Sequence, residues 1–149
     1  MKYFLLVLIS ISMWATVFAQ APVAPTKLQV HLKVDPNVSR TLTEVPPDSL
    51  SQVLATLPMQ CTYLIQLTDT MGADSIQVKF GTTDGGGELF ETKVSIDGGG
   101  LSTGMTFLRN GKLVRLGLGN FVGVTSFFAE ARLVNNQNQL SGAAKYARP

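Results

Sequence analysis

The sequence predicts one all-β domain, an antiparallel sandwich of about seven strands that follows an N-terminal signal helix. The first observation is the alternation of apolar and polar residues in most segments after residue 27, which is typical of strands with one buried face. The second is the spacing of the Gly-rich and Asn-rich stretches between these segments, which matches the turns of β-sandwiches. We therefore expect residues 28–149 to form the sandwich, with residues 20–27 as an extended lead-in.

Residues 1–19 have the character of a secretory signal peptide. Lys2 precedes an apolar-rich run that is shorter than the roughly 20 residues of a bilayer span. Val17 and Ala19 supply the small residues expected before the cleavage site. The sequence thus predicts cleavage after Ala19 and a secreted protein, extracellular or periplasmic, that has no membrane span afterwards. An uncleaved anchor is the alternative, because Met13 and Trp14 lengthen the apolar run.

Residues 28–34 are expected to form the first strand, because their apolar residues alternate with Gln29, His31 and Lys33. Farther along, residues 49–57 are expected to form one short helix. Their apolar residues recur at helical spacing, and Asp48 or Ser49 can cap the helix, with Gln52 three residues after Ser49. A further irregular strand is the alternative for this segment.

The next expected strands are residues 61–67, 76–80 and 90–96, in each of which the apolar residues are in phase. The strongest turn signal beyond them is Asn110-Gly111, because a type I′ turn needs positive φ at both central residues. This turn would pair Phe107 with Val114 and Thr106 with Arg115. Phe107 would then face the core, and Thr106 would face solvent.

Residues 125–146 are expected to form the hairpin that completes the sandwich. From Phe127 to Leu133, every second residue is apolar or small, and the opposite face carries Phe128, Glu130 and Arg132. The polar run 135–139 ends this strand. Asn138 is the expected position of positive φ, since Asn tolerates left-handed backbone better than any residue except Gly. Residues 140–147 should return as the last strand.

The approach to this hairpin resembles fibronectin type III and related immunoglobulin-like domains. Phe121, Gly123, Thr125 and Phe127 fall at the spacing of the Leu-x-Pro-x-Thr-x-Tyr sequence before the penultimate strand of such domains, and the resemblance spans roughly residues 60–147. It implies an immunoglobulin-like sandwich but says little about activity, because this fold hosts many functions. Phe127 stands where the family has the Tyr of the corner hydrogen bond, and Gly123 stands where it has Pro.

The single Cys and the single His are assigned by the same alternation. Cys61 is in phase with apolar residues and is expected to be a small buried side chain; intermolecular pairing or a reactive thiol is the alternative. His31 is in phase with polar residues and is expected in solvent. No Gly-x-Ser-x-Gly elbow is present, and neither residue is placed to form a hydrolytic triad. The sequence therefore predicts no enzyme, no metal site and no cofactor.

The acidic residues fall in turns and at outward positions. Two Asp-Gly-Gly-Gly motifs, 84–87 and 97–100, fit tight turns; neither matches a phosphate-binding loop or supplies the oxygen ligands of a calcium loop. Asp84 and Glu88 form a candidate polar loop for partner binding. If these turns do bind a ligand, the side chains to test are Asp69, Asp74, Asp84 and Asp97.

An apolar candidate surface lies just before the last hairpin. Phe128 faces away from the core side of its strand, and Phe121, Val122 and Val124 are expected in the preceding loop. Together these four residues could form an exposed partner surface. The alternative is a second packed layer beneath the 49–57 segment.

These observations favour a secreted, non-enzymatic β-sandwich module for binding or structural support, with an unknown protein or glycan as partner. The formal net charge is only +2, and Lys and Arg are spread along the strands, which argues against nucleic acid. A carbohydrate-binding module is the first alternative, which would require a row of exposed aromatics. A hydrolase with an unfamiliar carboxylate site is the second.

Overall fold

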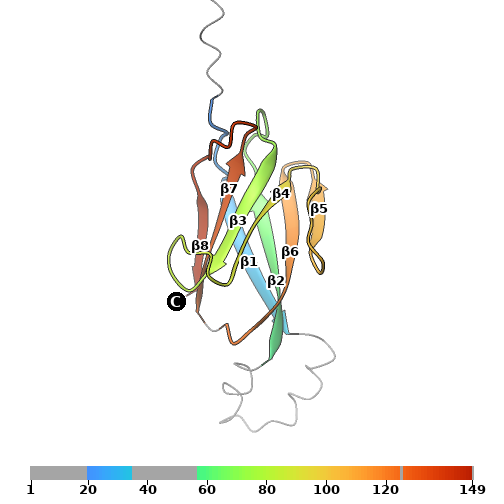
Figure 1. Cartoon of the computed structure of the whole chain (residues 1–149), viewed down its shortest axis with the longest axis vertical. Helices are drawn as coiled ribbons and strands as arrows, with labels where there is room; N and C mark the ends of the chain where they lie inside the picture. Colours follow the sequence, from blue (N-terminus) through green and yellow to red (C-terminus); the bar gives the residue numbers. More distant parts are fainter. Residues whose placement is uncertain (1–19, 35–56, 125, 149) are drawn as a thin grey trace, which may run out of the picture.

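A computed structural model describes residues 20–34, 57–124 and 126–148. In these residues the chain forms two four-stranded antiparallel sheets with one core between them, as Figure 1 shows. The predicted all-β sandwich is confirmed, with eight strands in place of about seven. The expected signal helix 1–19 and all but the last residue of the expected short helix 49–57 lie outside the described residues.

The eight strands divide between two sheets, which we call sheet A and sheet B. In spatial order, sheet A contains β1 (Lys27–Val34), β2 (Pro58–Gln66), β6 (Leu113–Val122) and β5 (Thr106–Asn110). Sheet B contains β4 (Phe90–Ser95), β3 (Ser75–Gly81), β7 (Phe127–Val134) and β8 (Ala144–Arg148). The chain crosses from one sheet to the other after β2, β4 and β6, so each sheet joins strands that are distant in the sequence.

The core is built from the apolar residues that alternate along each strand. Phe80 of β3 lies at its centre and is fully buried. Its ring centroid is 4.9 Å from that of Phe121, 5.0 Å from that of Phe127 and 6.4 Å from that of Tyr63. The Tyr63 hydroxyl donates a 2.6 Å hydrogen bond to the carbonyl of Lys79, which links sheet A to sheet B. The one hydroxyl in this aromatic cluster therefore has a partner, as a buried polar group requires.

The expected faces of Cys61 and His31 are confirmed. Cys61 is 1% exposed, and burial raises the pKa of its thiol from 9.0 to about 12. The thiol is therefore protonated at neutral pH, which makes it a poor nucleophile. His31 is exposed on the outward face of β1.

The turn between β5 and β6 lies one residue later than predicted. Its two loop residues are Gly111 and Lys112, because Asn110 belongs to β5 and pairs across the turn. Only Gly111 has positive φ (+57°), and glycine at the first loop position is typical of a type II′ turn, not of the predicted type I′ turn. Phe107 consequently pairs with Leu116. The partner of Phe107 is thus two residues later than predicted. Because side chains alternate with a period of two, this shift keeps every side chain on its predicted face.

A β-bulge interrupts the alternation of β6. Cys61 pairs with Gly119 and Thr62 pairs with Gly117, which leaves Leu118 as an extra residue on β6. Gly119 has φ of +100°, a conformation that favours glycine. The bulge thus explains the glycine at position 119.

The bulge also changes which residues face the core. Beyond it, Phe121 packs against Phe80, whereas Val122 is 62% exposed. The expectation that Phe121 and Val122 lie in a loop is wrong, because β6 continues as far as Val122.

The hairpin of β7 and β8 follows the prediction at its turn and departs from it afterwards. Asn138 has the expected positive φ, at 59°. The last strand begins at Ala144, not at residue 140, and only one isolated bridge precedes it. The Ser141 hydroxyl accepts a 2.8 Å hydrogen bond from the backbone N–H of Leu133, so a side chain replaces a backbone carbonyl as the partner of that group.

Candidate functional site

The four residues of the predicted apolar surface do not form one exposed patch. Val124 is only 6% exposed and belongs to the core, so its side chain cannot contact a partner. Phe121 is half-buried against the core, and Phe128 is half-buried on β7. Val122 is the one member of the set that is largely exposed. The set is dispersed because Phe121 and Val122 are consecutive residues of β6, and consecutive strand residues point to opposite faces.

The predicted polar loop lies between β3 and β4, and both of its carboxylates have partners within the domain. Asp84 accepts hydrogen bonds from the ammonium of Lys145, with N–O distances of 2.9 and 3.2 Å. Glu88 accepts a hydrogen bond from the Thr83 hydroxyl, which lowers the pKa of its carboxyl. These contacts hold the loop to itself and to β8.

The Asp-Gly-Gly-Gly motifs are turns, as their sequences predict. Gly85 in the first motif and Gly98 and Gly100 in the second all have positive φ. Asp97 lies 3.6 Å from the guanidinium of Arg109. Over residues 20–34, 57–124 and 126–148, no group of three or more His, Cys, Asp or Glu side chains is placed to hold a metal ion.

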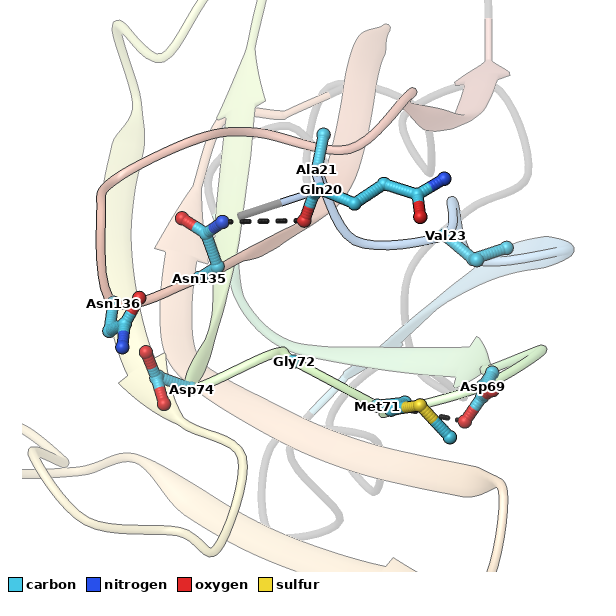
Figure 2. Close-up of a pocket in the computed structure, with 9 residues that line it drawn as sticks. All are labelled: Gln20, Ala21, Val23, Asp69, Met71, Gly72, Asp74, Asn135 and Asn136. Atoms are coloured by element: carbon cyan, nitrogen blue, oxygen red, sulfur yellow. Dashed lines mark hydrogen bonds between the residues drawn. The ribbon is translucent and has the colours of Figure 1, made fainter. Parts of the chain in front are cut away.

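The other two candidate acids, Asp69 and Asp74, border a recess of about 530 Å³ at the lead-in end of the sandwich, which Figure 2 shows. Three segments that are far apart in the sequence form this end recess: the lead-in, the β2–β3 loop and the start of the β7–β8 loop. Its lining consists of Gln20, Ala21, Val23, Asp69, Met71, Gly72, Asp74, Asn135 and Asn136. The sequence motifs could not reveal it, because no single segment carries more than one side of it.

Asn135 holds the end recess in shape. The residue is 3% exposed, and its amide oxygen accepts hydrogen bonds from the backbone N–H groups of Gln137 (3.0 Å) and Gln139 (2.9 Å). The amide nitrogen donates to the Gln139 side chain (2.8 Å) and to the carbonyl of Gln20 (3.5 Å). Figure 2 shows the last of these bonds, which ties the lead-in to the β7–β8 loop. A buried amide with partners on both sides fixes its neighbours in place.

The carboxylate of Asp69 is fixed in a similar way. It accepts a 3.0 Å hydrogen bond from the backbone N–H of Met71, and the β2–β3 loop is further held by the backbone N–H of Asp74, which donates to the carbonyl of Val134 (2.8 Å). The lining that the described residues provide offers carboxylates and amides, and it includes no Ser, Cys, His or Lys. The end recess can therefore accept and donate hydrogen bonds, but its side chains do not supply a nucleophile with an adjacent base.

A second hollow, which the sequence analysis missed, lies on the outward face of sheet A. It has a volume of about 370 Å³ and is lined by His31, Lys33, Gln60, Thr62, Leu64 and Arg115. An adjoining hollow of about 330 Å³ shares Gln60, Thr62 and Arg115 and extends to Thr106. The cations that the sequence spreads over separate strands thus meet on one face, because the sheet order places β1, β2 and β6 side by side.

Within the described part of the chain, no helix has the length and hydropathy needed to cross a membrane. No protein-family model matches the sequence, and neither a curated protein nor a solved structure matches it.

Proposed function

We propose that this chain is a secreted immunoglobulin-like module that binds a partner and does not catalyse a reaction. The strand order supports the immunoglobulin-like type. If β1 to β8 are lettered A, B, C, C′, D, E, F and G, sheet A reads A-B-E-D and sheet B reads C′-C-F-G. Immunoglobulin domains have the sheets A-B-E-D and C-F-G, and some add C′ beside C.

The observation that carries the binding function is the end recess. The β2–β3 and β7–β8 loops that border it correspond to the B–C and F–G loops, which variable immunoglobulin domains use for recognition. Asp69, Asp74 and Asn136 present polar groups to it, and Val23 and Met71 add apolar surface, 52% and 83% exposed. A few fixed polar groups beside apolar surface are typical of recognition sites. The partner is a protein or glycan that offers hydrogen-bond donors to these carboxylates.

The test compares the mature chain, residues 20–149, with the double variant Asp69→Asn, Asp74→Asn. Asn keeps the size of each side chain and the oxygen that Met71 N–H requires, so the fold should persist. A partner is first captured from the native extracellular fraction and identified, and its affinity is then measured with purified components. We expect the variant to bind at least about tenfold more weakly, a loss of roughly 1.4 kcal/mol.

The matched control is Asp84→Asn, Asp97→Asn, which removes the same charge from two exposed turns outside the end recess and should bind as the wild type does. Equal affinity of the wild type and both variants would mean that the partner does not bind at the end recess. Turnover of a substrate that the Asp69→Asn, Asp74→Asn variant abolishes would overturn the non-enzymatic assignment.

Secretion has its own spectroscopic test. Trp14 is the only tryptophan, so a form that begins at Gln20 should show no indole fluorescence. An intact mass that includes residues 1–19 would contradict cleavage at this position.

A further inference from the structure

We propose that the outward face of sheet A binds an anionic polysaccharide, in a groove that crosses β1, β2 and β6. This site shares no lining residue with the end recess. It therefore goes beyond the function proposed above, and the two sites can be tested separately.

The floor of the groove is a row of four residues that runs across the strands, and three of the four are Thr or Gly. His31, Thr62, Gly117 and Thr106 are paired in succession from β1 to β5. A Cβ on Gly117 would lie 2.4 Å from the hydroxyl oxygen of Thr106, so the floor stays open only because this position is glycine. Gly119, at the bulge, lines the same hollow. Three strand spacings make the row roughly 14 Å long, enough for an extended chain.

The two neighbouring rows form the walls, and each wall carries a cation. Lys33 pairs with Gln60 on one side of the floor, and Leu64 pairs with Arg115 on the other. The four strands of sheet A contain no Asp or Glu. Among the described residues, no ion pair uses Lys33 or Arg115. Their charges are therefore free to attract a carboxylate or sulfate.

The polar lining favours sugars over the other polyanions. Gln60, Thr62 and Asn120 offer amide and hydroxyl groups that match the hydroxyls of a sugar chain. Among the described residues, His31 is the only aromatic ring in the lining, so the groove does not offer the aromatic stacking that holds single-stranded nucleic acid. For the same reason the groove does not suit a neutral glycan that would need a row of exposed aromatics, and the charge of an anionic polysaccharide must supply the attraction.

The shape of the groove argues against the remaining polyanions. An acidic peptide in extended form would add to a sheet edge, whereas this groove crosses the middle strands β2 and β6. A membrane surface binds amphipathic faces that insert apolar residues, and it would not reach a floor set between two walls. A linear anionic polysaccharide fits both the charge and the depth.

The experiment titrates the mature chain with heparin, which is sulfated, and alginate, which is carboxylated. Neutral dextran, a single-stranded oligonucleotide and phosphatidylserine vesicles serve as comparison ligands. The first variant, Lys33→Gln with Arg115→Gln, removes a cation from each wall. The second, Thr62→Tyr, fills the floor and leaves every charge in place. The control, Lys93→Gln with Arg148→Gln, removes two exposed cations from sheet B.

We expect heparin or alginate to bind, with an affinity that falls as salt rises, and dextran not to bind. The wall variant and Thr62→Tyr should each bind at least about tenfold more weakly, while the sheet B control should change affinity less than about twofold. All variants should melt at the wild-type temperature, because the substituted residues lie on the outward face.

Three results would overturn the proposal. The first is equal weakening by the wall and control variants, which would mean that only net charge matters. The second is full binding by Thr62→Tyr, which would place the ligand outside the groove. The third is tighter binding of the oligonucleotide or the vesicles with the same dependence on Lys33 and Arg115, which would assign the groove to that polyanion. The Asp69→Asn, Asp74→Asn variant should bind the polysaccharide normally, which separates this test from that of the end recess.

Discussion

The charged side chains on the outward faces of the two sheets differ in whether they have partners of opposite charge. On sheet B, the ammonium of Lys79 lies 3.6 Å from the Glu91 carboxylate, Gln77 donates a 2.8 Å hydrogen bond to Glu91, and Glu130 pairs with Arg132. On sheet A, the strands carry cations and no acid. The polar groups of sheet B thus bind mainly to one another, whereas those of sheet A remain available to solvent or to a ligand.

This difference indicates which face contributes to folding. Glu130 is only 6% exposed, and its hydrogen bond to Arg132 raises the pKa of that guanidinium. A charged group that is this deeply buried is costly to leave without a partner. Exposed charges such as those of Lys33 and Arg115 contribute little to stability. Sheet B therefore serves as the scaffold, and sheet A can vary its charges with little effect on the fold.

The largest effect should come from the core that both sheets share. Phe80→Ala should cost roughly 3–5 kcal/mol of unfolding free energy, because it removes a fully buried ring that contacts three other aromatic rings. Phe107→Ala, at a half-buried position on the edge strand β5, should cost clearly less. Urea denaturation measures both values. Equal losses of unfolding free energy would mean that Phe80 contributes no more to the packing of the two sheets than Phe107 does.

High pH should destabilise the protein through the inward side of sheet A. The unfolded chain ionises Cys61 above about pH 9, whereas the buried thiol keeps its proton up to about pH 12. In this window the contribution of Cys61 to stability should fall by about 1.4 kcal/mol per pH unit. Cys61→Val lacks this contribution, so its stability should fall less steeply than that of the wild type. Parallel pH profiles for the two proteins would contradict the burial of the thiol.

The contrast between the two faces can be tested directly with one neutralised charge on each. Glu130→Gln should cost about 1.5–3 kcal/mol, because it removes a buried charged partner of Arg132. Arg115→Gln on sheet A should change stability by less than about 0.5 kcal/mol. Thermal and urea unfolding of both variants would decide this. The contrast fails if Arg115→Gln is as costly as Glu130→Gln.

The smallest effect concerns the turn that joins β5 to β6. Gly111→Val should cost roughly 1–2 kcal/mol, because Val resists the positive φ of this position. Asn110→Val should be nearly neutral, since Asn110 is in strand conformation on an exposed edge. A type I′ turn would make both substitutions costly, because both of its central residues have positive φ. A large loss of unfolding free energy from Asn110→Val would therefore support the type I′ turn.

Local pattern was sufficient to predict where most strands lie and which of their residues face the core, although not the end of β6 or the start of β8. The alternation at Cys61, the outward position of His31 and the positive φ of Asn138 all depend on neighbouring residues only, and all three predictions are confirmed. The turn at Gly111 was placed one residue too early because the same Asn-Gly pair fits two turn types, and sequence alone does not choose between them.

The candidate sites were harder to predict because each depends on the order of strands in space. Lys33 and Arg115 lie more than eighty residues apart, and only the sheet order β1-β2-β6 brings them to one groove. The end recess similarly joins Gln20 to Asn135. The sequence signal that could have pointed to the groove was the pair Gly117 and Gly119, since glycines inside a strand often mark a bulge or a close approach.

The bulge in β6 also constrains how this protein can evolve. Closure of the bulge without loss of a residue would restore simple alternation, and so would turn Phe121 out of the core and Val122 into it. The bulge depends on Gly119, because its φ of +100° favours glycine. A substitution at Gly119 would thus damage the packing around Phe80 and the floor of the groove together. Among natural descendants of this chain, we therefore expect Gly119 to be inherited unchanged while the β3–β4 loop, like other loops, varies in sequence and length.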